Sequence, residues 1–250
     1  MDHFVLILAA GEGSRLKSDI PKQFLELNGI PIIMHSLLAF READPSAKIF
    51  IALSKKNQSY WLELCEKYNF NIDHQIYTGG KQRSDTVFRG LQEITKFNNK
   101  NNSIVSIHDA ARPFIDKNFI LELLQAAKLH GSAVPVISLK SSLRQIDLNH
   151  LSNSSSKNRE KYILTQTPQV FDFKKIYDGY QKLFNKSNFI DNESYIELTP
   201  PVFDDASVYE LINDKLSTFI LDGREYNIKI TTKLDYYLSG KIYDFFKNLK

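Results

Sequence analysis

The chain has 250 residues, of which 42% are hydrophobic, and it carries 32 basic and 29 acidic side chains. This composition predicts a full hydrophobic core. The net charge of +3 is too small to indicate nucleic acid or a membrane as a partner. A single cysteine excludes an intrachain disulfide. The first apolar run is too short for a signal peptide, and no segment approaches the roughly 20 apolar residues of a membrane span, so we expect a cytoplasmic protein.

Apolar strands and amphipathic helices alternate through the first half of the chain. We expect strands, as short apolar runs, at 3–10, 48–53, 74–77, 103–107 and 132–136. We expect helices, from apolar residues at helical spacing, at 30–42, 56–68, 83–95 and 116–130. This alternation predicts an α/β fold with a mostly parallel sheet flanked by helices on both faces. Ligands bind such sheets at the carboxyl ends of the strands.

The alternation breaks at residues 137–162, which are polar and rich in serine and asparagine. A structureless loop of this length is unusual inside a compact domain, so we interpret 137–162 as an arm that packs on a second subunit. We expect its flanks, 139–146 and 162–166, to pair as two strands, with 151–158 as the most loop-like part.

Globular patterning returns after residue 168. We expect helices at 173–184, 205–213 and 232–249, and strands at 216–221 and 227–231. Residues 1–250 are thus predicted to form one domain into which the arm is inserted.

A glycine-rich loop follows the first strand and is accompanied by cations. Its residues of interest are Ala9, Ala10, Gly11 and Gly13, followed by Arg15 and Lys22. Glycine lets a backbone approach a ligand closely, and N–H groups in such a turn can hold phosphate oxygens. The loop matches neither the dinucleotide fingerprint nor the P-loop spacing. Alone it is explained by a tight turn with solvated charges, but with the loops described next it predicts phosphate binding.

Two glycines, Gly79 and Gly80, follow the third expected strand. A double glycine can bring backbone N–H and C=O groups against the edge of a base. The alternative is a flexible loop in which Ser84 or Asp85 caps the next helix. Both interpretations are compatible with each other.

Asp109 directly follows a buried apolar strand. A carboxylate is costly there unless it is paired or holds a metal ion. Mg²⁺ with nucleotide phosphates typically uses one or two carboxylates, so Asp109 is a candidate ligand. The structural alternative is an ion pair with Arg112. For the neighbouring His108, a packed or hydrogen-bonded histidine is favoured over a catalytic base.

Three stretches in the second half of the chain also carry polar or charged residues that could belong to the site. Residues 165–169 are compatible with a turn, and 204–207 with a helix N-terminus, where aspartate is a favoured cap; a part in the site is the open alternative for each. Lys229 lies between two isoleucines, so alternation turns it away from their face, either into a cleft or into water. A site rich in glycine, arginine and lysine, with one metal-competent aspartate, suits phosphoryl or nucleotidyl transfer.

Seven motifs occur in a set order: 8–15 (LAAGEGSR), 21–23 (PKQ), 79–80 (GG), 108–113 (HDAARP), 167–169 (TPQ), 204–207 (DDAS) and 227–231 (NIKIT). Together they resemble the 2-C-methyl-D-erythritol 4-phosphate cytidylyltransferase family of the non-mevalonate isoprenoid pathway. The resemblance implies a Rossmann-like nucleotidyltransferase fold, a requirement for Mg²⁺ or another divalent cation, and a homodimer joined by a protruding β-arm.

The resemblance also implies roles for individual residues. CTP would be bound by Ala9, Ala10, Gly11, Gly13, Gly79, Gly80, Thr86 and Asp109, the last serving the ribose or the metal. The catalytic cations would be Arg15, Lys22 and Lys229. The polyol phosphate acceptor would be bound by Arg112, Ser142, Arg159, Thr167 and Asp204, some of them from the partner's arm. The implied reaction is in-line attack of the acceptor 4-phosphate on the α-phosphorus of CTP, with loss of pyrophosphate.

The sequence departs from the family pattern on the acceptor side. Phe203 stands where threonine is usual, Tyr226 where aspartate is common, and Ser141-Ser142 where an Asp-Thr/Ser pair is usual. Ribitol-5-phosphate cytidylyltransferase is therefore the nearest alternative, although Ala110-Ala111 favours methylerythritol phosphate. A CTP-binding module without turnover is a third reading, against which the retention of Lys22 and Lys229 argues.

Overall fold

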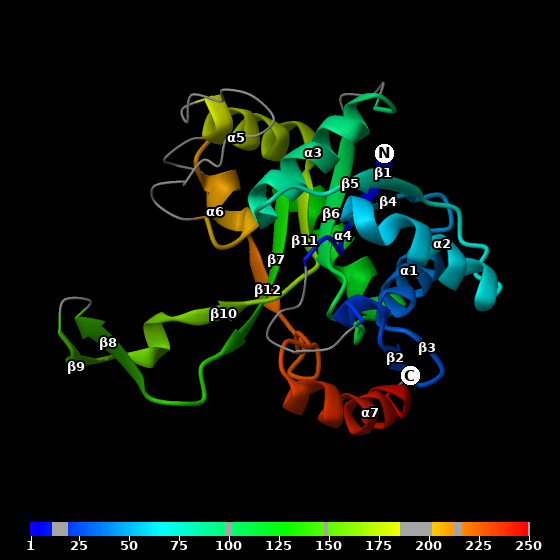
Figure 1. The fold of residues 1–250 in the computed structure, drawn as a ribbon. Coiled ribbons are helices and arrows are strands. Elements are labelled where there is room, and N and C mark those ends of the chain that lie inside the picture. Colours follow the sequence, from blue (N-terminus) through cyan, green and yellow to red (C-terminus); the bar gives the residue numbers. More distant parts are fainter. Residues whose placement is uncertain (12–19, 99–101, 148–149, 186–201, 213–216, 250) are drawn as a thin grey trace.

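The computed structural model describes residues 1–11, 20–98, 102–147, 150–185, 202–212 and 217–249. A central sheet of eight strands has the order β10-β7-β11-β6-β1-β4-β5, with β12 beside β7 (Figure 1). Its strands are β1 (Asp2–Leu8), β4 (Lys48–Leu53), β5 (Gln75–Thr78), β6 (Ser103–Asp109), β7 (Ser132–Ser138), β10 (Ile163–Thr165), β11 (Gln169–Asp172) and β12 (Ile220–Asp222). A separate two-stranded hairpin is made by β2 (Glu26–Leu27) and β3 (Ile30–Pro31).

The sheet is mostly parallel, as predicted. Strand β1 pairs in parallel with both β4 and β6, and β4 pairs in parallel with β5. Strand β11 runs antiparallel between β6 and β7, and it begins at Gln169, inside the stretch interpreted as a turn. The carboxyl ends of β1, β4, β5 and β6 consequently lie at one edge of the sheet.

Helices cover both faces of the sheet because its strands are apolar on both sides. On one face lie α1 (Ile32–Ala43), α2 (Gln58–Lys67) and α4 (Lys117–His130), which pack against alternate β1 residues such as Val5 and Ile7. On the other lie α3 (Arg83–Thr95), α5 (Phe173–Asn185) and α6 (Asp205–Glu210), which pack against Phe4 and Leu6. None of the helices in these described ranges is long and apolar enough to cross a bilayer.

The C-terminal helix α7 (Lys233–Lys247) packs near the turn that follows β6. It begins with a capping box in which Thr232 and Asp235 bond each other's backbone. Its Phe246 packs with Phe114 and Ile230 in a third, smaller apolar cluster. The chain immediately before α7, which carries Lys229, is thereby fixed against the turn that follows β6.

The arm forms, but with different strand pairs from those predicted. Strand β8 (Leu143–Asp147) pairs with β9 (His150–Lys157) in a hairpin that protrudes from the sheet (Figure 1). The expected pairing of 139–146 with 162–166 is wrong, because β10 pairs with β7 instead, and 151–158 lies mostly in β9. The side chains of β8 are nearly all exposed, so no buried face imposes the alternation from which strand register is read.

Two C-terminal expectations are also corrected. The strand expected at 216–221 is observed as β12, Ile220–Asp222. Residues 227–231 lie within the described range but form no strand. One backbone bond joins them to the turn after β6, from the Ile230 N–H to the Ala111 carbonyl at 2.9 Å, and the Arg112 side chain adds a bond to the Asn227 carbonyl at 2.8 Å. A single backbone bond satisfies the local backbone but does not build a ladder.

Candidate active site

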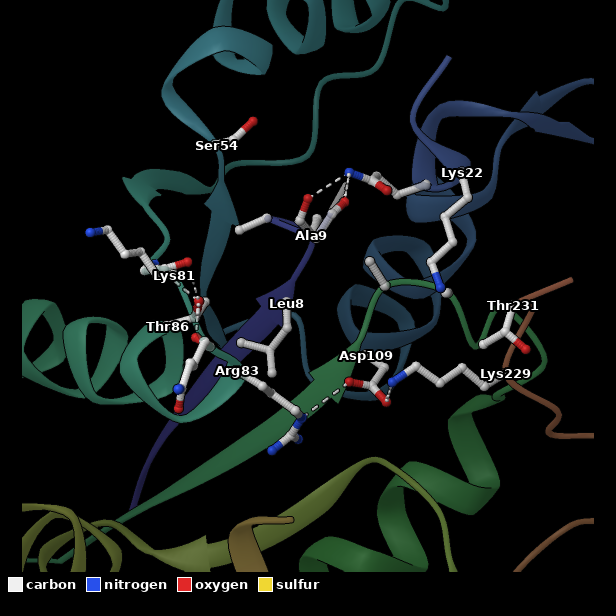
Figure 2. Close-up of a pocket in the computed structure, with 17 residues that line it drawn as sticks. Leu8, Ala9, Lys22, Ser54, Lys81, Arg83, Thr86, Asp109, Lys229 and Thr231 are labelled. Carbon is white, nitrogen blue, oxygen red and sulfur yellow. Dashed lines mark hydrogen bonds and ion pairs between the residues drawn. The ribbon is translucent and has the colours of Figure 1, made fainter. Parts of the chain in front are cut away.

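A cavity of about 590 Å³ opens at the carboxyl ends of the parallel strands. This is the size of a small-molecule site and the place where ligands bind doubly wound sheets. Of the predicted site residues, it is lined by Ala9, Ala10, Gly11, Lys22, Gly80, Thr86, Asp109 and Lys229 (Figure 2). Gly13 and Arg15 lie outside the described residues. The lining therefore brings together three loops and the two predicted lysines, which are far apart in sequence, and Lys81 lines the cavity as well.

The first loop is held in place by Gln23, for which the sequence predicted no role. The side-chain amide of Gln23 donates to the Ala9 carbonyl at 2.6 Å and to the Gly11 carbonyl at 3.3 Å. Gln23 is buried, and it sits in the single turn of 3₁₀ helix at Lys22–Phe24. Holding Gln23 in place sets its neighbour Lys22 at the cavity, where Lys22 Nζ donates to the Ile230 carbonyl at 3.0 Å. Gln23 thus holds the first loop in place, and its neighbour Lys22 puts a positive charge at the cavity.

The second loop needs glycine because it approaches the first so closely. A Cβ at Gly79 would lie 2.3 Å from the Ala10 Cβ, which is too close for any real contact. The Gly80 N–H donates to Thr86 Oγ1 at 3.0 Å, and Asp85 Oδ2 accepts the Lys81 N–H at 3.1 Å. Side chains from the first turn of α3 therefore order the loop, but the capping alternative is wrong: the N-cap of α3 is Gln82, no side chain among the described residues caps the helix, and Asp85 bonds the loop instead.

Asp109 is the centre of charge in the cavity. Its carboxylate is 2.8 Å from Lys229 Nζ and 3.5 Å from Arg83 Nε (Figure 2). It is also 3.7 Å from Arg112 Nε. Burial alone would raise the pKa of Asp109, but the three cations hold it well below its ordinary value. The expected alternative of an ion pair with Arg112 is therefore present, as one contact of three. Lys229, whose direction the sequence left open, turns into the cavity.

Arg83 is a site residue that sequence reasoning missed. It donates to both oxygens of Asp205, at 3.0 and 2.6 Å, and Tyr180 Oη donates to the same carboxylate at 2.6 Å. Asp205 is fully buried. Burial by itself lowers the pKa of Arg83, but the negative charges of Asp205 and Asp109 raise that pKa well above its usual range. Because Asp205 is 122 positions away from Arg83 in the sequence, residue spacing could not predict that the two side chains pair. The only local hint was an arginine directly after a double-glycine loop.

His108 is a packed and hydrogen-bonded histidine, as expected. It is fully buried, and burial lowers its pKa to about 3, so the ring is neutral at physiological pH. Its Nε2 lies 3.0 Å from the Arg112 carbonyl and its Nδ1 lies 3.1 Å from Thr167 Oγ1. Nothing in this setting suits a group that must exchange protons with a substrate.

The residues assigned to the acceptor do not converge within one chain. Thr167 is buried against His108, while Asp204 caps α6 by accepting the Ser207 N–H at 3.1 Å. Ser142 and Arg159 are exposed near the base of the β8–β9 hairpin. Arg112 does not line the cavity; it donates to the Asn227 carbonyl at 2.8 Å and lies beside Asp109. Their predicted role in acceptor binding stays a prediction.

The donor set at Asp109 fits a divalent cation that is held mainly by a substrate. Within the described residues, no three acidic, histidine or cysteine side chains gather as a ready-made metal cluster. Mg²⁺ that serves nucleotide phosphates is usually held by one or two carboxylates together with the phosphates themselves. A single cavity-lining carboxylate at the end of β6 meets that requirement.

The chain is similar to proteins of one family over nearly its whole length. A profile of 2-C-methyl-D-erythritol 4-phosphate cytidylyltransferase matches residues 3–244. A relative of that name from Bacteroides thetaiotaomicron is 34% identical over 237 residues, which are 94% of this chain and 96% of the relative. The crystal structure of the Francisella tularensis protein of the same name has a TM-score of 0.75 at 26% identity, covering 97% and 100% of the two chains. A synthase from Anaerococcus prevotii, at 23% identity and a TM-score of 0.76, shares the fold.

Proposed function

The chain belongs to the 2-C-methyl-D-erythritol 4-phosphate cytidylyltransferase family, and on this premise we propose how its site acts. It transfers the cytidylyl group of CTP to 2-C-methyl-D-erythritol 4-phosphate, giving 4-diphosphocytidyl-2-C-methyl-D-erythritol and pyrophosphate. The observation that carries the proposal is the convergence of Lys22 and Lys229 on one cavity bounded by two glycine loops and Asp109. Such a site supplies alignment and positive charge, which phosphoryl-type transfer chiefly needs.

The two loops divide the nucleotide between them in this proposal. Gly79, which lies close against Ala10, and Gly80 receive the base, and the Ala9–Gly13 backbone receives the triphosphate. Thr86 orders the base loop through its bond to the Gly80 N–H. The proposed contribution of Arg15 to the triphosphate rests on the family resemblance.

The transfer proceeds by in-line attack of an acceptor phosphate oxygen on the α-phosphorus of CTP. As that P–O bond forms, the bond from the α-phosphorus to the bridging oxygen breaks and pyrophosphate leaves with the electron pair. Lys22 and Lys229 offset the charge that gathers on the five-coordinate phosphorus. Asp109 would hold Mg²⁺ together with the phosphates, or the ribose, and the cation would supply further neutralisation of phosphate charge.

In this proposal, a second subunit completes the acceptor-binding site. Ser142 and Arg159 are exposed and lie on the arm rather than at the cavity of their own chain. Exposed apolar side chains, Ile146, Tyr162 and Ile163, lie along the arm and its base, which suits contact with a partner. We therefore propose a homodimer in which each arm contributes to its partner's site. A cytoplasmic location also stays a prediction.

The departures from the family pattern bear on the choice of acceptor. Tyr226 packs its ring 5.5 Å from that of Phe246 on α7, so it belongs to the third apolar cluster. Phe203 is 84% exposed just before α6. Neither residue lines the cavity. Ribitol 5-phosphate is the alternative acceptor, and it requires the same chemistry.

Turnover of the two acceptors side by side tests the function. With Mg²⁺ and CTP, we expect pyrophosphate release only when a polyol phosphate is added, and faster release with methylerythritol phosphate than with ribitol 5-phosphate. Faster turnover of ribitol 5-phosphate would overturn the acceptor assignment. No turnover with either, while CTP still binds, would favour a binding module.

Removing either cavity lysine tests the charge argument. We expect Lys22→Ala and Lys229→Ala each to lower kcat by more than about a hundredfold, as for loss of one transition-state donor. Lys174→Ala, which removes a lysine paired with Asp178 on the surface of α5, is the matched control and should keep the wild-type rate. A near-wild-type kcat in either cavity variant would refute its role.

Sedimentation of the wild-type protein tests the partner proposal. We expect a dimer at micromolar concentration, and Arg159→Ala subunits should regain part of their activity when mixed with Lys229→Ala subunits, because one mixed site then has both residues. A monomer with full activity would contradict the proposed sharing of sites.

A further inference from the structure

A closed ring of hydrogen bonds lies directly beneath the cavity and joins three segments of the chain. Its members are His108 at the end of β6, Arg112 in the turn that follows, Thr167 before β11 and Asn227 in the loop before α7. His108, Thr167 and Asn227 are buried, with exposed fractions of 0%, 5% and 0%. Two further buried atoms of its members, Arg112 Nε and Asn227 Oδ1, have no hydrogen-bond partner among the described residues. The bonds that are made tie the three segments together in the interior, where the loss of a bond is costly.

Each step of the ring is a short contact. His108 Nε2 lies 3.0 Å from the Arg112 carbonyl, and Arg112 Nη1 donates to the Asn227 carbonyl at 2.8 Å. Asn227 Nδ2 donates to the Thr167 carbonyl at 2.9 Å, and Thr167 Oγ1 lies 3.1 Å from His108 Nδ1, which closes the ring.

The chemistry of these groups fixes every hydrogen. The Arg112 carbonyl only accepts, so the proton of the neutral imidazole is on Nε2. Nδ1 is then an acceptor, and the Thr167 hydroxyl donates to it. The oxygen of that hydroxyl in turn accepts the Asp109 N–H at 3.1 Å. Valine in place of Thr167 would keep the shape and lose both bonds, whereas serine would keep both.

The ring is placed so that it sets the reacting groups relative to one another. Asp109 is bonded to it through its N–H, and Arg112 N–H returns to the Asp109 carbonyl at 3.0 Å. Lys229 follows Asn227 by two residues, and its Nζ is 2.8 Å from Asp109 Oδ2. A shift of the 224–231 loop against β6 would change that distance directly, and catalysis depends on sub-ångström placement of such groups.

We infer that His108, Thr167 and Asn227 are positioning residues, which hold Asp109 and Lys229 in register for the transfer without touching either substrate. This inference rests on the proposed function and revises one part of it. Thr167, assigned to the acceptor by resemblance, acts through His108 and the Asp109 backbone.

The decisive variants are Thr167→Val and Thr167→Ser, with Thr95→Val at the exposed end of α3 as the matched control. We expect Thr167→Val to lower kcat at saturating CTP and acceptor by about tenfold or more, the scale for leaving buried polar groups unpaired. Thr167→Ser should restore the rate to within about threefold, and Thr95→Val should match wild type. A Thr167→Val enzyme with unchanged kcat and a raised acceptor KM would overturn the inference in favour of a direct ligand. Failure of serine to restore the rate would also overturn it.

A second measurement needs neither turnover nor a variant. Nitrogen-15 NMR of the imidazoles in the wild-type protein at neutral pH should show His108 protonated on Nε2 and unprotonated on Nδ1. Protonation on Nδ1 would break the ring as assigned and refute the inference. If the wild-type protein turned over no acceptor, the proposed function would fail while this measurement still judged the ring.

Discussion

The ionised carboxylate of Asp109 is the constraint on which the site depends. A carboxylate this close to the core persists as an ion only where opposite charge compensates its lost hydration. Here the compensation comes from three elements: Arg83 at the start of α3, Arg112 after β6, and Lys229 before α7. One side chain thus gathers segments that begin more than 100 residues apart. The arrangement links the packing of the sheet to the geometry of the cavity.

The charge of this cluster suits the chemistry. Three cations surround Asp109, and Asp205 offsets Arg83 through a bidentate contact, so positive charge is left over at the cavity. Lys22, which also lines the cavity and bonds the Ile230 carbonyl beside Lys229, adds to this charge. A ligand that carries several phosphates supplies the missing negative charge, and it does so where the loop backbone also offers N–H groups. In the proposed function, binding of CTP and stabilisation of the transfer would therefore draw on the same groups, and the family relationship gives this chemistry its substrates.

Much of the part of the site that we propose for CTP could be predicted from the sequence, because it depends on residues that are close together in the chain. An apolar strand that ends in glycine predicts β1 and the loop that follows it. The position of Asp109 after a buried strand predicts that its charge must be compensated. These two signals depend on neighbours in sequence, and the structure agrees with them. The double glycine at 79–80 predicts a close approach to a base, which stays a prediction, while the close approach observed at Gly79 is to Ala10.

The rest depended on contacts between distant residues. Nothing in the spacing of Arg83 and Asp205 indicates that they pair, and the alternation around Lys229 could not say which side faced the cavity. The arm strands have no buried face, so their register could not be read. Gln23, His108 and Asn227 are ordinary polar residues in sequence, and their roles appear only when the carbonyls they bond are brought beside them.

Equilibrium unfolding of Asp109→Asn in urea tests the central claim most directly. If Asp109 organises the site, the substitution leaves three cations crowded without their counter-charge, and the free energy of unfolding falls by about 3 kcal/mol. Asp178→Asn, in an exposed pair with Lys174 on α5, is the matched control and should change stability far less. An unchanged or increased stability of Asp109→Asn would contradict the account, because it would mean that the carboxylate serves the ligand alone and holds nothing in place.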